Sequence, residues 1–131
     1  MRLGDADAIR TIRYWAGILG IDPIYQFKVK VNNAPDPDVK VKDRKDIQAT
    51  VSVDQSYFSI RITINAYEFE ASELDGVVIH ELIHVVLAPL DSIVTASLGP
   101  LSEHATNLCE AATERLTQAF VKLARAKKGM K

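Results

Sequence analysis

An apolar run from Leu74 to Leu87 places three ionisable residues, His80, Glu81 and His84, within five positions. Apolar residues occupy nearly every side of a helix drawn through this run, which predicts a buried helix. Burying an ionisable group without a partner costs free energy. A chain that contains this helix must therefore build its core around it and also supply partners for its polar side chains.

The expected bounds of this helix follow from residues at its two ends. Ser72 is a suitable N-cap, and Asp75 three residues later completes a capping-box-like signature. Pro89 lacks a backbone N–H and predicts that the helix ends just past Leu87. Residues Ala88 to Pro100 are then expected to form a loop with at most a short helical turn.

The spacing of the two histidines points to a metal ion. Side chains at i and i+4 lie one turn apart on the same helical face, so both imidazoles reach one ion. Glu81 follows His80 and lies beside that ion. This is the H-E-x-x-H arrangement of zinc-dependent proteases, in which the glutamate is the general base. The competing interpretation is a buried helix whose two histidines are hydrogen-bonded core residues.

The remaining elements follow from hydrophobic periodicity. Helical spacing predicts a first helix from Asp5 to Leu19 and a last helix from about Ser102 to Lys127. Period-two alternation predicts three strands, Tyr25 to Val31, Ile47 to Val53 and Phe58 to Asn65, with a long exposed loop, Asn32 to Asp46, after the first. The apolar stripe of the last helix comprises Ala105, Leu108, Ala112, Leu116, Ala119, Phe120 and Leu123.

These elements predict an α+β fold. The short turn after Val53 favours an antiparallel hairpin, and the alternation implies a sheet covered on one face. We expect a small antiparallel or mixed three-stranded sheet packed on one face by helices, in the order α-β-β-β-α-α. A length of 131 residues predicts a single domain, residues 1–131.

A catalytic zinc ion takes three protein ligands, so a third must come from outside the motif. Leu87 and Leu90 occupy the positions where a downstream histidine ligand would stand. Asp91, His104 and the acidic residues of the last helix remain, namely Glu103, Glu110 and Glu114.

Glu110 and Glu114 are i,i+4 partners on that last helix. One can bind the metal while the other accepts the second N–H of a ligand histidine. The alternative is a solvated acidic face. The metal interpretation requires this side to face the His-bearing helix while the Leu108–Leu116 stripe packs elsewhere.

His80-Glu81-Leu82-Ile83-His84, followed by Glu110-Ala111-Ala112-Thr113-Glu114, resembles the zincin metallopeptidases of glutamate-ligand type. The resemblance implies that Glu110 is the third zinc ligand and that Glu114 bonds to His80. The stretch from His80 to Asp91 is similar to small phage-encoded zincins, which implies a minimal zincin-like fold. The histidine and tyrosine that stabilise the transition state in larger zincins have no obvious match, and the candidates by residue type are His104, Tyr57 and Tyr67.

The expected function is therefore a Zn²⁺-dependent hydrolase, a peptidase acting on a peptide or protein. Glu81 would take a proton from the activated water and pass it to the leaving amine. If the strand from Phe58 to Asn65 is a sheet edge, an extended substrate could add to it. The alternatives are a zincin-fold binding or structural module that holds zinc without turnover, and a metallohydrolase with a non-peptide substrate.

Composition sets the expected partners and location. The net charge is −1, with 47% hydrophobic and 25% charged residues, so neither nucleic acid nor a membrane is expected as a partner. Cys109 is the one cysteine, so no intrachain disulfide forms, which fits a reducing compartment. The sequence shows no signal-peptide pattern and no membrane span, and we expect a cytoplasmic protein.

Overall fold

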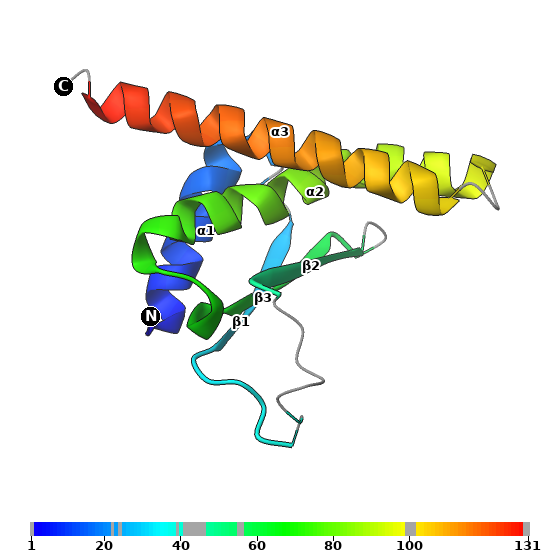
Figure 1. The fold of residues 1–131 in the computed structure, drawn as a ribbon. Coiled ribbons are helices and arrows are strands. Elements are labelled where there is room, and N and C mark those ends of the chain that lie inside the picture. The colour runs from blue at the N-terminus through cyan, green and yellow to red at the C-terminus, as the bar shows by residue number, and fades with distance from the viewer. Residues whose placement is uncertain are drawn as a thin grey trace.

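The computed structural model describes residues 2–21, 23, 25–38, 40, 47–54, 57–98 and 102–129, and the backbone alone for residues 90–98, 102–106 and 127–129. Figure 1 shows α3 lying along one side of α2 and the sheet on the opposite side of α2. α1 lies beside α2. The elements in chain order are α1 (Asp5–Ile18), β1 (Gln26–Asn32), β2 (Ala49–Asp54), β3 (Ser59–Asn65), the 3-10 helices η2 (Ala66–Glu68) and η3 (Ala71–Glu73), α2 (Leu74–Leu98) and α3 (Ser102–Gly129).

The three strands form one mixed sheet in the order β1-β3-β2. β1 runs parallel to β3, with Val29 opposite Ile62, and β2 runs antiparallel to β3, with Val51 opposite the same residue. The α+β class, the element order and the antiparallel hairpin are confirmed. The expectation that the Phe58–Asn65 strand could be a sheet edge is wrong, because β3 is the central strand and β2 is an edge.

Helices cover one face of this sheet. Ile60, Ile62 and Ile64 of β3 are fully buried, whereas Arg61 between them is exposed. The difference in burial between successive residues is smaller in β1 and β2 than in β3. Among the described residues, β1 and β2 each have a neighbouring strand on one side only. The core therefore lies between the sheet and the helices α1 and α2, and its α2 members are Val77, Val78, Ile79, Leu82, Ile83 and Val85.

Two apolar residues that the alternation placed inward lie outside the strands. Phe58 has a φ of 49° and is 46% exposed, and its ring packs edge-to-face on that of Tyr25. The left-handed backbone turns the chain immediately before β3 begins at Ser59, which redirects the Phe58 side chain. Ile47 precedes β2 and is 38% exposed. Alternation carried past a strand end thus overstated the burial of both residues.

Helix α2 is longer than the sequence predicted. It continues past Pro89 to Leu98, so the expected end near Leu87 and the expected loop from Ala88 to Pro100 are wrong. A proline inside a helix removes one backbone hydrogen bond and costs about 3 kcal/mol, which contacts with neighbouring elements can offset. The contacts between α2 and α3 are the most extensive of any two helices described.

The start of α2 also differs from the expected cap. Ser72 lies inside η3 and does not cap α2, which begins at Leu74. The backbone N–H of Glu70 donates to the Glu73 carboxylate at 2.8 Å, and the N–H of Glu73 donates to the Glu70 carbonyl at 2.9 Å. A single turn of 3-10 helix thus leads directly into α2.

Trp15 ties α1 to the start of α2. Its ring is 5% exposed, and its Nε1–H donates to the Asp75 Oδ1 atom at 2.9 Å. The hydrogen bond satisfies the one polar atom of a buried indole. α1 ends one residue earlier than expected, at Ile18, and Gly20 follows with a φ of 72°. Trp15 therefore anchors α1 to the core.

Helix α3 does not bury its predicted apolar stripe. Thr113 and Thr117 are buried at 0% and 3% exposure, whereas Leu108, Leu116 and Leu123 are 58%, 41% and 67% exposed. The side chain of Ala105 lies outside the described residues. The side of α3 that packs on α2 is thus turned away from the leucines, and the reason lies in the polar contacts described below.

The expected loop from Asn32 to Asp46 is described only in part. Asn32 is the last residue of β1, residues 33–38 and 40 form neither helix nor strand, and residues 41–46 lie outside the described residues. Within the described part of the chain, no helix combines the length and apolar character needed to cross a membrane.

Candidate metal centre

The two motif histidines lie on the side of α2 that faces α3. Their ring centroids are 4.9 Å apart, as expected for side chains one helical turn apart. His80 and His84 are 20% and 29% exposed, so they are half-buried and are not part of the apolar core. The neighbours Ile79, Leu82 and Ile83 take the core side of the same helix.

Glu110 of α3 contacts both histidines at once. Its Oε1 atom lies 2.9 Å from His80 Nε2, and its Oε2 atom lies 3.1 Å from His84 Nε2. One ligand-type atom from each of the three residues lies within 4.8 Å of the others. The tertiary structure thus brings together the two motif histidines and the glutamate that the resemblance implied.

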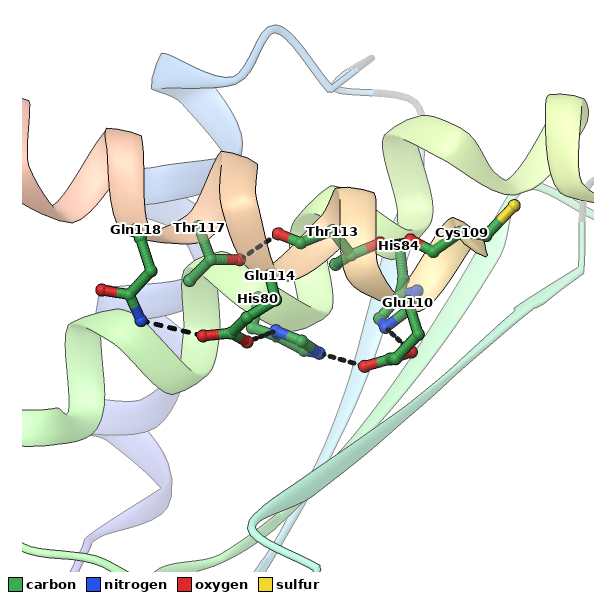
Figure 2. A network of polar contacts seen from close by, with 8 residues as sticks. All are labelled: His80, His84, Cys109, Glu110, Thr113, Glu114, Thr117 and Gln118. Carbon is green, nitrogen blue, oxygen red and sulfur yellow. Dashed lines mark hydrogen bonds and ion pairs between the residues drawn. The ribbon is translucent and has the colours of Figure 1, made fainter. Parts of the chain in front are cut away.

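Glu114, one turn further along α3, contacts the other side of His80. Its Oε2 atom lies 3.1 Å from His80 Nδ1, and its Oε1 atom accepts a hydrogen bond from Gln118 Nε2 at 2.8 Å. Figure 2 shows the resulting chain of contacts from Gln118 through Glu114 and His80 to Glu110. Glu114 therefore fixes the orientation of the His80 ring, with Gln118 holding the carboxylate in place.

The donor set fits a divalent cation. Both ring nitrogens of His80 contact carboxylates, but a neutral imidazole carries one N–H. A proton on Nδ1, bonded to Glu114, leaves the Nε2 lone pair directed at Glu110, where a cation shared with that carboxylate removes the conflict. Zinc with bonds of about 2.1 Å in tetrahedral geometry holds its ligand atoms about 3.4 Å apart. The three ligand-type atoms lie within 4.8 Å of one another, and the 2.9 and 3.1 Å contacts join the two histidines to different oxygens of Glu110.

Glu81 lies beside this group on α2 and is 8% exposed. Its carboxyl group has no hydrogen-bond or ion-pair partner among the residues that the structure describes. Burial, and secondly the charge of Glu110, raises the pKa of Glu81 from 4.5 to about 8. A carboxyl group that titrates near neutrality beside a potential metal site is well matched to proton transfer at physiological pH.

The buried threonines explain how α3 can turn its glutamates toward α2. The hydroxyl of Thr113 donates to the Cys109 carbonyl, and that of Thr117 donates to the Thr113 carbonyl, both at 2.8 Å. Because each hydroxyl is satisfied within its own helix, burying it costs little. Small, satisfied side chains thus replace leucines in the contact with α2 and leave room for Glu110 and Glu114 to reach the histidines.

A cavity of about 1240 Å³ adjoins the histidines. One wall carries the metal-site residues, and another is formed by the edge strand β2, which contributes Ala49, Val51 and Val53. His80, Glu81, His84 and Glu110 line the cavity together with Val51 and Val53. The buried carboxyl of Glu81 thus opens onto a space beside a sheet edge.

The other predicted contacts have different outcomes. Tyr67 lies in η2, and it is not among the described residues that line this cavity. Tyr57 is 81% exposed. The side chains of Asp91, Glu103 and His104 lie outside the described residues, so these alternatives stay untested. Sequence reasoning missed Gln118, although its i+4 spacing from Glu114 was a usable signal.

No protein-family model, curated protein or solved structure matches this chain.

Proposed function

We propose that the chain is a zinc-dependent hydrolase that cleaves peptide bonds, with Glu81 as its general base. One observation carries the proposal. Glu81, which is 8% exposed and has no hydrogen-bond or ion-pair partner among the described residues, lies beside two histidines and a glutamate whose ligand-type atoms lie within 4.8 Å of one another. A hydrogen-bonded core has no use for an unpaired Glu81, whereas metal-assisted hydrolysis needs a base at this place.

In this proposal the residues divide the work by position. His80, His84 and Glu110 hold the metal, which supplies Lewis-acid chemistry by acidifying water and polarising a carbonyl oxygen. Glu114 acts as a positioning residue, because its contact with Nδ1 at 3.1 Å keeps the His80 ring turned toward Glu110. Gln118 supports it through the 2.8 Å hydrogen bond to the same carboxylate.

Glu81 performs the proton transfers. Burial and the nearby Glu110 charge raise its pKa to about 8, which makes the carboxylate a stronger base than an exposed glutamate. Glu81 takes a proton from the attacking water and later gives it to the leaving amine. A bound cation, by neutralising Glu110 and adding positive charge, would lower the pKa of Glu81 and favour the carboxylate form at neutral pH.

The sheet edge supports a peptide substrate. β2 pairs with β3 on one side, and Ala49, Val51 and Val53 line the cavity next to the histidines. An extended peptide can add to such an edge through main-chain hydrogen bonds. Such a peptide would run along the wall that β2 contributes to the cavity that Glu81 also lines. β2 replaces β3 as the expected docking strand.

The deciding experiment compares wild type with Glu81→Gln, both purified without a histidine tag and loaded with zinc. Unfolded casein is the test substrate, with new N-termini read by mass spectrometry. We expect both proteins to hold one zinc ion and only wild type to cleave. If both hold zinc and neither cleaves any peptide, the chain is a binding or structural module, and the proposal fails.

A further inference from the structure

The exposed side of α3 carries a continuous apolar surface, which we call the leucine face. Its described members are Leu108, Ala112, Leu116, Ala119 and Leu123, all exposed to solvent. The three leucines are 58%, 41% and 67% exposed. Single exposed leucines need no explanation, but a row of them on one helix marks an interaction surface.

The metal centre does not use this face. Glu114 lies about 160° around the helix from Leu116, since successive residues turn by about 100°. α3 forms the outer layer of the described fold, and it packs on α2 through the side that carries Thr113 and Thr117 (Figure 1). The leucine face is therefore free to bind a partner while the histidine–glutamate contacts remain in place.

We propose that the leucine face binds an amphipathic helix of a partner protein that carries carboxylates along one edge of its apolar stripe. The members of the face follow one another at helical spacings of four, four, three and four residues. Alanines alternate with leucines, so each small side chain leaves a notch between two large ones. Notches and ridges of this kind accept the side chains of a second helix, over a length of about 22 Å.

The expected charge of the partner follows from two basic residues beside the leucine face. Arg115 and Lys122 lie seven and fourteen residues after Leu108, and both are exposed. Neither has an ion-pair partner among the described residues. The acidic side chains described on α3, Glu110 and Glu114, are engaged with the histidines. A helix with acidic residues along its edge would meet these two cations.

Two other occupants fit the face less well. A second copy of this chain offers no carboxylate from the described part of α3 for Arg115 and Lys122, because Glu110 and Glu114 face α2. A lipid surface is bound by amphipathic helices whose apolar side carries Trp, Phe or Leu. The leucine face presents no aromatic residue, and the nearby Phe120 is half-buried.

The test uses the full chain and a designed fluorescent peptide of about three heptads, with leucine and alanine along one face and glutamate along its edge. A second peptide has lysine at the same edge positions. We expect the chain to bind the glutamate peptide at least about tenfold more tightly than the lysine peptide at low salt. Leu116→Glu or Leu123→Glu should weaken binding of the glutamate peptide by about tenfold or more.

The charge-reversed variant Arg115→Glu/Lys122→Glu should prefer the lysine peptide. Ile18→Glu, a matched change at a 51% exposed aliphatic residue on α1, should leave binding unchanged. Circular dichroism checks that each variant is folded. Absence of peptide binding by wild type, or binding that ignores the charge reversal, overturns the proposal. So does a dimer in sedimentation that Leu123→Glu dissolves, or binding to phosphatidylglycerol vesicles in place of the peptide.

Discussion

Helices α2 and α3 lie side by side, but different kinds of side chain are buried in each. α2 buries aliphatic residues such as Ile79 and Leu82 at 0% exposure and leaves its two histidines half-buried. α3 buries Thr113 and Thr117 and exposes its leucines. The hydrophobic pattern therefore sets the orientation of α2, whereas polar contacts to α2 set that of α3.

The difference has a physical cause. α2 lies between the sheet, α1 and α3, so most of its circumference is covered and its apolar residues leave water. α3 contacts α2 on one side, and that side carries the glutamates that reach His80 and His84. We infer that the contacts of Glu110 and Glu114 with the histidines set the rotation of α3 about its axis. The leucines of α3 therefore face away from α2.

The largest expected effect tests the polar centre itself. Replacing His80 or His84 by alanine removes one of three ligands, so we expect neither variant to retain stoichiometric zinc after dialysis. His104→Ala, which changes the alternative histidine ligand, should keep full zinc. Metal content is measured by mass spectrometry on untagged protein. Full zinc in both of the first two variants would place the metal elsewhere.

The second prediction compares leucines of the two helices. Leu82→Ala in α2 removes a side chain that is 0% exposed, and it should lower the free energy of unfolding by about 2–5 kcal/mol. Leu123→Ala in α3 changes a side chain that is 67% exposed, and it should change that free energy by about 0.5 kcal/mol or less. Urea denaturation measures both. Similar losses would mean that α3 packs through its leucines.

The third prediction concerns the buried base. Its raised pKa means that Glu81 binds its proton more tightly in the folded chain, so the contribution of Glu81 to metal-free stability is fully present below pH 4.5 and is lost as the pH rises to about 8. Glu81→Gln cannot titrate and serves as the control. Relative to it, wild type should lose on the order of 5 kcal/mol across this range. Parallel stability curves for the two proteins would show that the pKa of Glu81 is ordinary.

The last prediction separates the two glutamates of α3, whose replacements should differ in degree. Glu110→Ala removes a ligand, so zinc should be lost or held much more weakly, whereas Glu114→Ala frees the His80 ring and should weaken zinc binding by about 10–100-fold. Glu103→Ala is the control and should have no effect. Zinc titration measures all three variants. Equal and negligible effects would make Asp91 or His104 the next ligand to test, and a larger loss at Glu114 would exchange the two roles.

Much of the fold was predictable because its signals are local. Period-two alternation located all three strands, and the Asp54–Ser59 hairpin followed from its short turn. The helix end predicted from Pro89 was wrong, because α2 continues to Leu98. The cost of one lost hydrogen bond is a local property, whereas the contacts of α2 with α3 are tertiary. Phe58 misled because alternation says nothing about the left-handed residue at the turn.

The sequence by itself determined the buried helix, the pairing of His80 with His84 one turn apart, and Glu81 beside them, because i,i+4 geometry is fixed within one helix. Only the tertiary structure decided that Glu110 and Glu114 reach those histidines and that the leucines of α3 face outward. The rotation of α3 about its axis depends on contacts between residues about thirty positions apart. Periodicity within α3 favoured the leucine side, but it carries no information about the polar groups that α2 presents.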